Sequence, residues 1–129
     1  MSGEKDLDIL IKNMKPSLNA GEYVFVTVDE MPEISAEKIL FSFREEEGLS
    51  PILEKSTADD LGFSYSFVAA WITLRVHSSL EAVGLTARFA EALTQVGISC
   101  NVVAAYYHDH IFVPSHQAEK ALSALQKLK

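Results

Sequence analysis

The chain has 129 residues, of which 48% are hydrophobic, and its 11 basic and 18 acidic side chains give a formal net charge of −7. That length fits one compact domain or two small ones that share a core, and the apolar content excludes an intrinsically disordered chain. The negative charge argues against nucleic acid and against an anionic membrane surface as partners, because both need a basic face.

The first predicted element is a short helix near the start of the chain. Four apolar residues recur there at helical spacing: Leu7, Leu10, Ile11 and Met14. Pro16 ends the pattern, because the residue before a proline disfavours helical dihedral angles. The segment mixes charges among its apolar positions, and no apolar run in the chain approaches the roughly 20 residues that span a bilayer. A cytoplasmic protein is therefore expected.

Two further pieces of the N-terminal half have clear local patterns. The stretch EYVFVTV (residues 22–28) is rich in aromatic and β-branched residues and predicts a strand. The stretch DEMPEIS that follows is typical of a loop. Farther along, STADDLG (residues 56–62) indicates a capped single turn of helix.

Residues 39–55 leave two interpretations open. They could form a helix that ends at Gly48, since apolar residues share one helical face. They could equally form a hairpin with residues 46–48 as its turn. The hairpin is preferred, and three of its residues would then alternate inward: Ile39, Phe41 and Phe43.

The second half of the chain gives a clearer pattern. Residues 67–76 predict a strand with four residues on one face: Ala70, Ile72, Leu74 and Val76. A helix that ends at Gly97 follows, and its apolar stripe is Leu85, Phe89, Ala92, Leu93 and Val96. The stretches ISCNVVAAYY and HIFVP are strands joined near His108 and Asp109. A last helix begins near Ser115, with the stripe Ala118, Ala121, Leu122, Leu125 and Leu128.

The order strand, helix, strand, strand, helix from residue 67 onward is most of a βαββαβ unit, in which two helices cover one face of an antiparallel sheet. This unit is one strand short, whereas the N-terminal half holds at least one surplus strand, residues 22–28. We therefore expect an α+β, ferredoxin-like fold with two co-folded halves, residues 1–66 and 67–129, that complete each other's sheets.

Gly84 lies where the strand of residues 67–76 passes into the following helix. Ser78 and Glu81 have the spacing of a capping box, so one helix could run from Ser78 through Gly84, at a cost of about 1 kcal/mol relative to alanine. Alternatively, the strand ends near His77 and the helix begins at about Gly84. The N–H groups of Gly84 and Leu85 would then lack intrahelical partners and would favour a carboxylate, which a glycine lets approach the backbone. The residues alone leave both alternatives open.

A longer stretch, LRVHSSLEAVGLTARFAEALTQVGISCNVVAAYYHDHIFVP, resembles the regulatory ACT fold. The typical run there is a strand, a turn ending in glycine, a helix, GI, a strand and a hairpin into IFV. The form SLEAVGLTARFAEAL is similar to the tandem ACT modules of aspartate kinases and to the cytosolic arginine sensors of animal cells. The chain looks closest to a family of small, mostly bacterial proteins made of two ACT-like units. The match is specific over residues 67–125, and FREEEGLSPILEK resembles the same family, although LSP replaces an expected threonine and apolar residue.

The resemblance implies a binding site for a small amino acid at an interface between paired units. The turn and helix start would hold the carboxylate, through Ser78, Ser79, Val83, Gly84 and Leu85. The strand after GIS would meet the amino group with backbone carbonyls or a side-chain amide, through Asn101 and Val102. Such modules pass a signal to an attached enzyme, and this chain is too short to contain one. Either binding has been lost, or the signal reaches a separate partner enzyme.

Other constellations of reactive residues have plainer explanations. Cys100 lies in an apolar run, where a buried, inert thiol is the expected role, and a disulfide within the chain is impossible. The REEEG run is typical of a solvated turn rather than of an acid–base pair. Tyr106 and Tyr107, with Trp71, would suit base stacking, but the chain carries no cluster of basic residues.

Three functions follow from these patterns. The leading hypothesis is a non-enzymatic, homo-oligomeric ACT-type regulator that binds an amino acid and needs no cofactor or metal. The alternative is an interaction module that pairs through exposed edge strands without a small ligand. The third is a small metal-dependent enzyme that uses His108 and His110, with His77 and His116 as further candidate ligands. A turn with side-chain hydrogen bonds is the expected role of that histidine pair.

Overall fold

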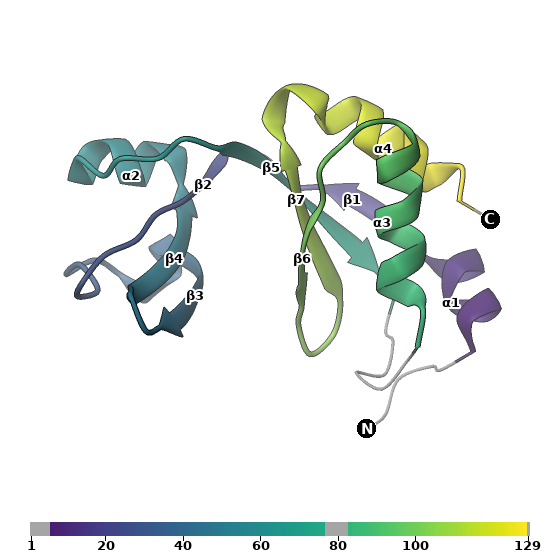
Figure 1. Ribbon diagram of the computed structural model, residues 1–129, viewed down its shortest axis with the longest axis horizontal. Coiled ribbons are helices and arrows are strands. Elements are labelled where there is room, and N and C mark those ends of the chain that lie inside the picture. The colour runs from purple at the N-terminus through teal and green to yellow at the C-terminus, as the bar shows by residue number, and fades with distance from the viewer. Residues whose placement is uncertain (1–5, 77–82, 129) are drawn as a thin grey trace. The chain divides into compact units, whose positions relative to one another are not determined.

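The computed structural model describes residues 6–76 and 83–128 (Figure 1). Contacts between residues divide the chain into two compact units. The central unit is residues 21–69, and the terminal unit combines residues 1–20 with residues 70–129. The predicted division of the chain at residues 66 and 67 stays a prediction.

The terminal unit contains three α-helices and four strands among its described residues. In chain order these are α1 (Leu7–Asn13), β1 (Lys15–Leu18), β5 (Val68–Arg75), α3 (Leu85–Gln95), β6 (Asn101–Ala104), β7 (Asp109–Pro114), the 3-10 turn η2 (Ser115–Gln117) and α4 (Ala118–Gln126). The first two residues of β5 belong to the central unit. Every helix and strand predicted from residue 67 onward is present, as is the short helix before Pro16, although the strand predicted over residues 98–107 is limited to Asn101–Ala104.

The sheet of the terminal unit has the strand order β1-β5-β7-β6. β1 lies antiparallel to β5, with Lys15 opposite Arg75 and Leu18 opposite Ile72, and β6 lies antiparallel to β7. β1 occupies the fourth strand position of the βαββαβ arrangement. The strand that the C-terminal half lacks is therefore supplied by residues 15–18 of the N-terminal segment, and the α+β, ferredoxin-like fold is confirmed.

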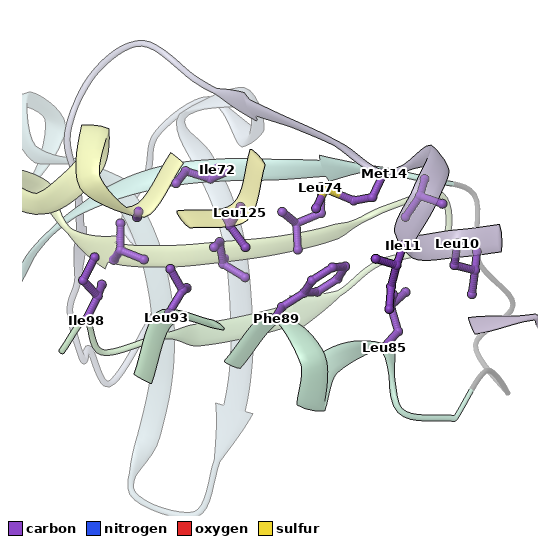
Figure 2. Packing of buried hydrophobic residues seen from close by; sticks show 14 of the residues in the cluster. Leu10, Ile11, Met14, Ile72, Leu74, Leu85, Phe89, Leu93, Ile98 and Leu125 are labelled. Carbon is purple, nitrogen blue, oxygen red and sulfur yellow. The ribbon is translucent and has the colours of Figure 1, made fainter. Parts of the chain in front are cut away.

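One core joins the helices of the terminal unit to one face of its sheet (Figure 2). Alternate residues of β5 and β7 contribute to it because successive strand side chains point to opposite faces. The buried members include Leu10, Ile11, Ile72, Leu74, Phe89, Leu93, Ile111, Val113 and Leu125. The predicted stripes of β5, α3 and α4 all contact this core, so the apolar periodicity identified the buried faces correctly.

The end of α3 fixes where the chain leaves the core. Gly97 has φ +74°, and its N–H donates to the carbonyl of Thr94. The N–H of Ile98 donates to the carbonyl of Leu93, and both of these side chains lie in the core. This pair of hydrogen bonds is a Schellman motif, which satisfies carbonyls that a helix end leaves free. The predicted stop at Gly97 is confirmed.

The central unit consists of one hairpin, a short strand and a short helix. Its elements are β2 (Tyr23–Phe25), the 3-10 turn η1 (Ala36–Lys38), β3 (Ile39–Glu45), β4 (Gly48–Glu54) and α2 (Lys55–Leu61), followed by the start of β5. The predicted strand of residues 22–28 is shorter than expected, although Val28 forms an isolated bridge to Leu49. The predicted single turn of residues 56–62 is a helix of 7 residues that ends at Gly62.

The hairpin preferred for residues 39–55 is confirmed, with Glu45 opposite Gly48. The inward position predicted for Phe43 is wrong, since that side chain is 61% exposed. The register shifts between Ile39 and Phe41, and every residue from Ser42 to the turn is exposed. Alternation therefore stops predicting burial there, because this end of the hairpin lies outside the core of its unit.

Candidate functional site

The start of α3 is the first part of the candidate site. Gly84 is the N-cap residue, with φ +92° and ψ −9°, and the N–H of Arg88 donates to its carbonyl across 3.1 Å. The helix therefore begins at Leu85, and the alternative of one helix running through Gly84 is wrong. Among the described residues, no side chain caps this end. The first N–H groups of a helix have no intrahelical partner and form its positive end, which favours an anion.

Packing also favours a glycine at the start of α3. A Cβ atom built on Gly84 would lie 3.3 Å from Cδ2 of Leu7 on α1, tighter than ordinary van der Waals contact. The left-handed dihedral angles add a separate reason, because side chains other than glycine rarely adopt them. Close packing at Gly84 thus involves the neighbouring helix α1.

The neighbours of Gly84 have different environments. Val83 is 85% exposed, and Leu85 is buried in the core of the terminal unit. Only the backbone of Leu85 is therefore available to a ligand. Ser78 and Ser79, which were predicted to line the same turn, lie outside the described residues.

The second part of the candidate site is β6, which lies at the edge of the terminal sheet. Asn101 is exposed, and its Nδ2 donates to the carbonyl of Phe112 across 3.3 Å. Val102 lies opposite Ile111 and packs against the core. Asn101 begins β6 shortly after α3 ends, whereas Gly84 lies at the opposite end of that helix (Figure 1). Within this unit, the two parts of the predicted site are therefore at different ends.

The hairpin between β6 and β7 holds two polar groups whose burial the sequence did not reveal. Asp109, the first residue of β7, is only 7% exposed, and burial raises the pKa of its carboxyl group. Nδ1 of the preceding His108 is buried and has no hydrogen-bond partner in the part of the chain that the structure describes. Both residues stood out only as a turn in the sequence, because their burial depends on tertiary packing.

Of the two neighbouring histidines, His110 forms a side-chain hydrogen bond. Nδ1 of His110 accepts from Nε1 of Trp71 across 3.0 Å. The rings of His108 and His110 have centroids 6.5 Å apart and lie edge to face. Within residues 6–76 and 83–128, no group of three or more histidine, cysteine, aspartate or glutamate side chains is arranged to hold a metal ion.

The remaining sequence candidates have structural environments that match simple roles. Cys100 is half-buried, and burial raises the pKa of its thiol to about 11, which makes it a poor nucleophile. Tyr106 and Tyr107 are exposed, and their rings contact edge to face with centroids 4.9 Å apart. Among the described helices, none is both long and apolar enough to cross a membrane.

Comparison with solved structures identifies proteins of similar fold and length. A Vibrio cholerae protein of unknown function, described as a possible transport protein, is 47% identical with a TM-score of 0.85, and the alignment covers 96% of each chain. A protein from Agrobacterium tumefaciens is 19% identical with a TM-score of 0.66 over 89% of this chain and 88% of that one. The ligand-free regulatory subunit of aspartate kinase from Thermus thermophilus is 11% identical with a TM-score of 0.65 over 91% and 97%. The last two show the fold alone.

Two family models together match residues 2–127 of the chain. No curated protein matches the sequence at a significant level. A family model described as ACT domain matches residues 2–70, and a second model with the same description matches residues 66–127. The chain therefore belongs to the ACT-domain family and carries two such domains in tandem.

Proposed function

We propose that the chain is a non-enzymatic regulatory protein of the cytoplasm that binds a small amino acid. The observation that carries this proposal is the start of α3, where a glycine with φ +92° replaces a capping side chain. The N–H groups of Leu85, Thr86 and Ala87 precede the first intrahelical hydrogen bond, which Arg88 donates. A carboxylate at this end would accept hydrogen bonds from them and would lie at the positive end of the helix dipole.

The proposed ligand has its amino group on β6. Asn101 has an exposed side chain whose amide would meet the amino group, and Val102 would contribute its backbone carbonyl at the edge of the sheet. Gly84 precedes the first residue of α3, whereas Asn101 follows its last turn by a short loop. A single amino acid therefore cannot bridge the two residues within one unit. The proposed pocket is formed where the turn of one ACT unit meets the edge strand of another, in the same chain or in a second copy.

Regulation would follow from the position of the ligand at such an interface. A ligand shifts an equilibrium only by its difference in affinity for the two arrangements. A bound amino acid would stabilise one pairing of units, and so change the assembly of the protein or its docking to a separate partner enzyme.

The direct test is a thermal-shift screen with the twenty amino acids, followed by calorimetry, on protein freed of bound ligand by refolding. A ligand present at 100 times its Kd adds about 2.7 kcal/mol to the free energy of unfolding, so a true ligand raises Tm clearly. Gly84→Ala should abolish the response. Gly97→Ala is the matched control, since it changes a glycine of similar φ at the other end of α3. No response to any amino acid at millimolar concentration would count against the proposal.

A second candidate function is an assembly module without a small ligand. The observation that favours it is the position of β6 at the edge of its sheet, with the exposed Tyr106 and Tyr107 in the adjoining loop. Edge strands pair readily with other chains. A stable dimer that forms through β6 and ignores all amino acids would support this function and contradict the first.

A further inference from the structure

The sheet of the terminal unit carries a set of linked polar side chains on the face opposite its helices, which we call the His110 network: Asn19, Trp71, Thr73 and His110. The adjacent residues on β5 and β7, including Ile72 and Ile111, point into the helical core, so the network residues point the other way. Asn19 follows β1 directly, and the other three lie on β5 and β7. The network therefore connects β5, β7 and the residue that follows β1.

The direction of each hydrogen bond in the His110 network follows from the chemistry of the groups. Nδ2 of Asn19 donates to the carbonyl of Trp71 across 3.2 Å and to Oγ1 of Thr73 across 2.9 Å. Oγ1 of Thr73 lies 3.2 Å from Nδ1 of His110, and Nε1 of Trp71 lies 3.0 Å from the same atom. An indole N–H can only donate, so Nδ1 of His110 must be the acceptor. The hydroxyl of Thr73 accepts a hydrogen bond from Asn19. It can donate its own hydrogen to Nδ1 of His110.

This geometry requires one protonation state of His110. A nitrogen that accepts a hydrogen bond carries no proton, so the ring is neutral and holds its single hydrogen on Nε2. An imidazolium would direct a second N–H from Nδ1 toward the N–H of Trp71. The two donors would then oppose each other, and only Thr73 could rotate its hydroxyl to accept. Protonation of His110 and the hydrogen bond to Trp71 are therefore mutually exclusive.

The charges around His110 act in the same direction. Burial lowers the pKa of His110 below its usual value, and electrostatic effects of His108 and of Arg75 on β5 lower it further. Lys15 on β1 lies opposite Arg75 and adds another positive group to this face. β6 places only the apolar Val103 opposite His110. The one carboxylate of the four strands, Asp109, alternates to the other face.

We propose that His110 is a pH-sensitive latch, which fastens β7 to Trp71 of β5 while its ring is neutral and releases that residue when the ring is protonated. The latch acts on the strand that pairs with β6, and hence on the edge of the sheet. It does not depend on the proposed amino-acid site. Acidification would protonate His110 and so loosen the contact between β5 and β7 around Trp71.

Trp71 makes the test direct, because it is the only tryptophan of the chain. Its fluorescence should show one transition between pH 8 and pH 4.5, with a midpoint below the ordinary histidine pKa of about 6.5. His110→Asn keeps an acceptor near the position of Nδ1 but cannot titrate, so this variant should keep the neutral-pH emission and lose the transition. His116→Asn, which removes an exposed histidine, should leave the transition unchanged. His108→Asn removes one of the groups that lower the pKa of His110 and should move the midpoint to higher pH.

A transition that persists in folded His110→Asn, or no transition in the natural sequence, would overturn the proposal. If His110→Asn does not fold, the tautomer of the His110 ring in the natural protein tests the proposal instead. Two-bond nitrogen–proton NMR spectra of the natural protein should show His110 protonated on Nε2 at neutral pH and titrating below about pH 6.5. A proton on Nδ1 at neutral pH, or an ordinary or raised pKa, would contradict the latch.

Discussion

Gly84 lies against Leu7, so that a Cβ atom added to the glycine would be 3.3 Å from Cδ2 of the leucine. Both the contact with α1 and the left-handed dihedral angles therefore favour glycine at position 84. The glycine therefore has a structural role beside its proposed role in binding, and the loss of stability in Gly84→Ala is measured separately from the loss of binding.

Gly84→Ala should lower the free energy of unfolding by about 1–2 kcal/mol, since a side chain in left-handed dihedral angles costs that much. Gly97→Ala should cost less, because nothing lies within 4 Å of the Cβ position there, whereas Gly84 also meets Leu7. Urea unfolding curves of the two variants measure the difference. Equal losses would show that the Leu7 contact contributes nothing.

The core prediction compares two phenylalanines. Phe89→Ala should lower the free energy of unfolding by about 3–5 kcal/mol, because the ring is fully buried between α3 and the sheet. Phe43→Ala should change it by about 0.5 kcal/mol or less, since that ring is 61% exposed. The midpoint of urea unfolding reports both. A large loss for Phe43→Ala, with a shift in oligomeric state, would instead reveal that this ring is covered in an assembly.

Stability should fall as the pH drops below the ordinary pKa of histidine. The folded protein lowers the pKa of His110, so the unfolded chain binds more protons in the window between the two pKa values. This stability is fully present above about pH 6.5 and is lost as pH falls through the lowered folded pKa. His110→Asn should flatten this part of the curve, measured by urea unfolding at steps from about pH 7.5 to pH 5. A curve as steep as that of the natural sequence would contradict the assignment.

Asp109 should behave in the opposite sense. Burial raises the pKa of its carboxyl group, so the folded chain binds more protons than the unfolded chain just above the ordinary aspartate value. Stability from this group is therefore present at low pH and is lost as pH rises through the raised pKa. Asp109→Asn should increase the free energy of unfolding at pH 7, because it removes a buried charge. Asp60→Asn, at an exposed position of α2, is the control and should change little.

Cys100 should react slowly with thiol reagents in the folded protein. Burial raises the pKa of its thiol from 9.0 to about 11, so the reactive thiolate is about 100-fold scarcer than in an unperturbed cysteine. The rate of reaction with an aromatic disulfide at pH 8 should rise at least by that factor in denaturant. A folded protein that reacts as fast as the denatured chain would show that the thiol is accessible and ionised.

The local patterns that the sequence carries predicted most of the terminal unit. Stripes such as Leu85, Phe89 and Leu93 identified both a helix and its buried face, because these residues contact a core along one side. The strand of residues 15–18 escaped notice. It is only 4 residues long and contains Pro16, which locally indicates the end of a helix. Its pairing with β5 depends on residues more than fifty positions away.

The sequence likewise predicted only part of the candidate site. The interrupted junction at Gly84 was one of two alternatives, and the choice between them depended on dihedral angles that a single sequence does not determine. The hydrogen bond from Asn19 to Thr73 joins residues separated by 54 positions, and the acceptor role of His110 follows from a tryptophan 39 positions away. Such contacts leave no periodicity, so the network and the burial of Asp109 emerged only from the folded structure.

The origin of β1 from the N-terminal segment has a consequence for biosynthesis. All elements of the central unit come from one continuous segment, residues 21–69, which can close as soon as the ribosome releases it. Residues 15–18 leave the ribosome before that segment but find their partner strand only after it has been made. We therefore expect the middle of the chain to fold first during translation, while the segment before it stays unpaired until β5 emerges.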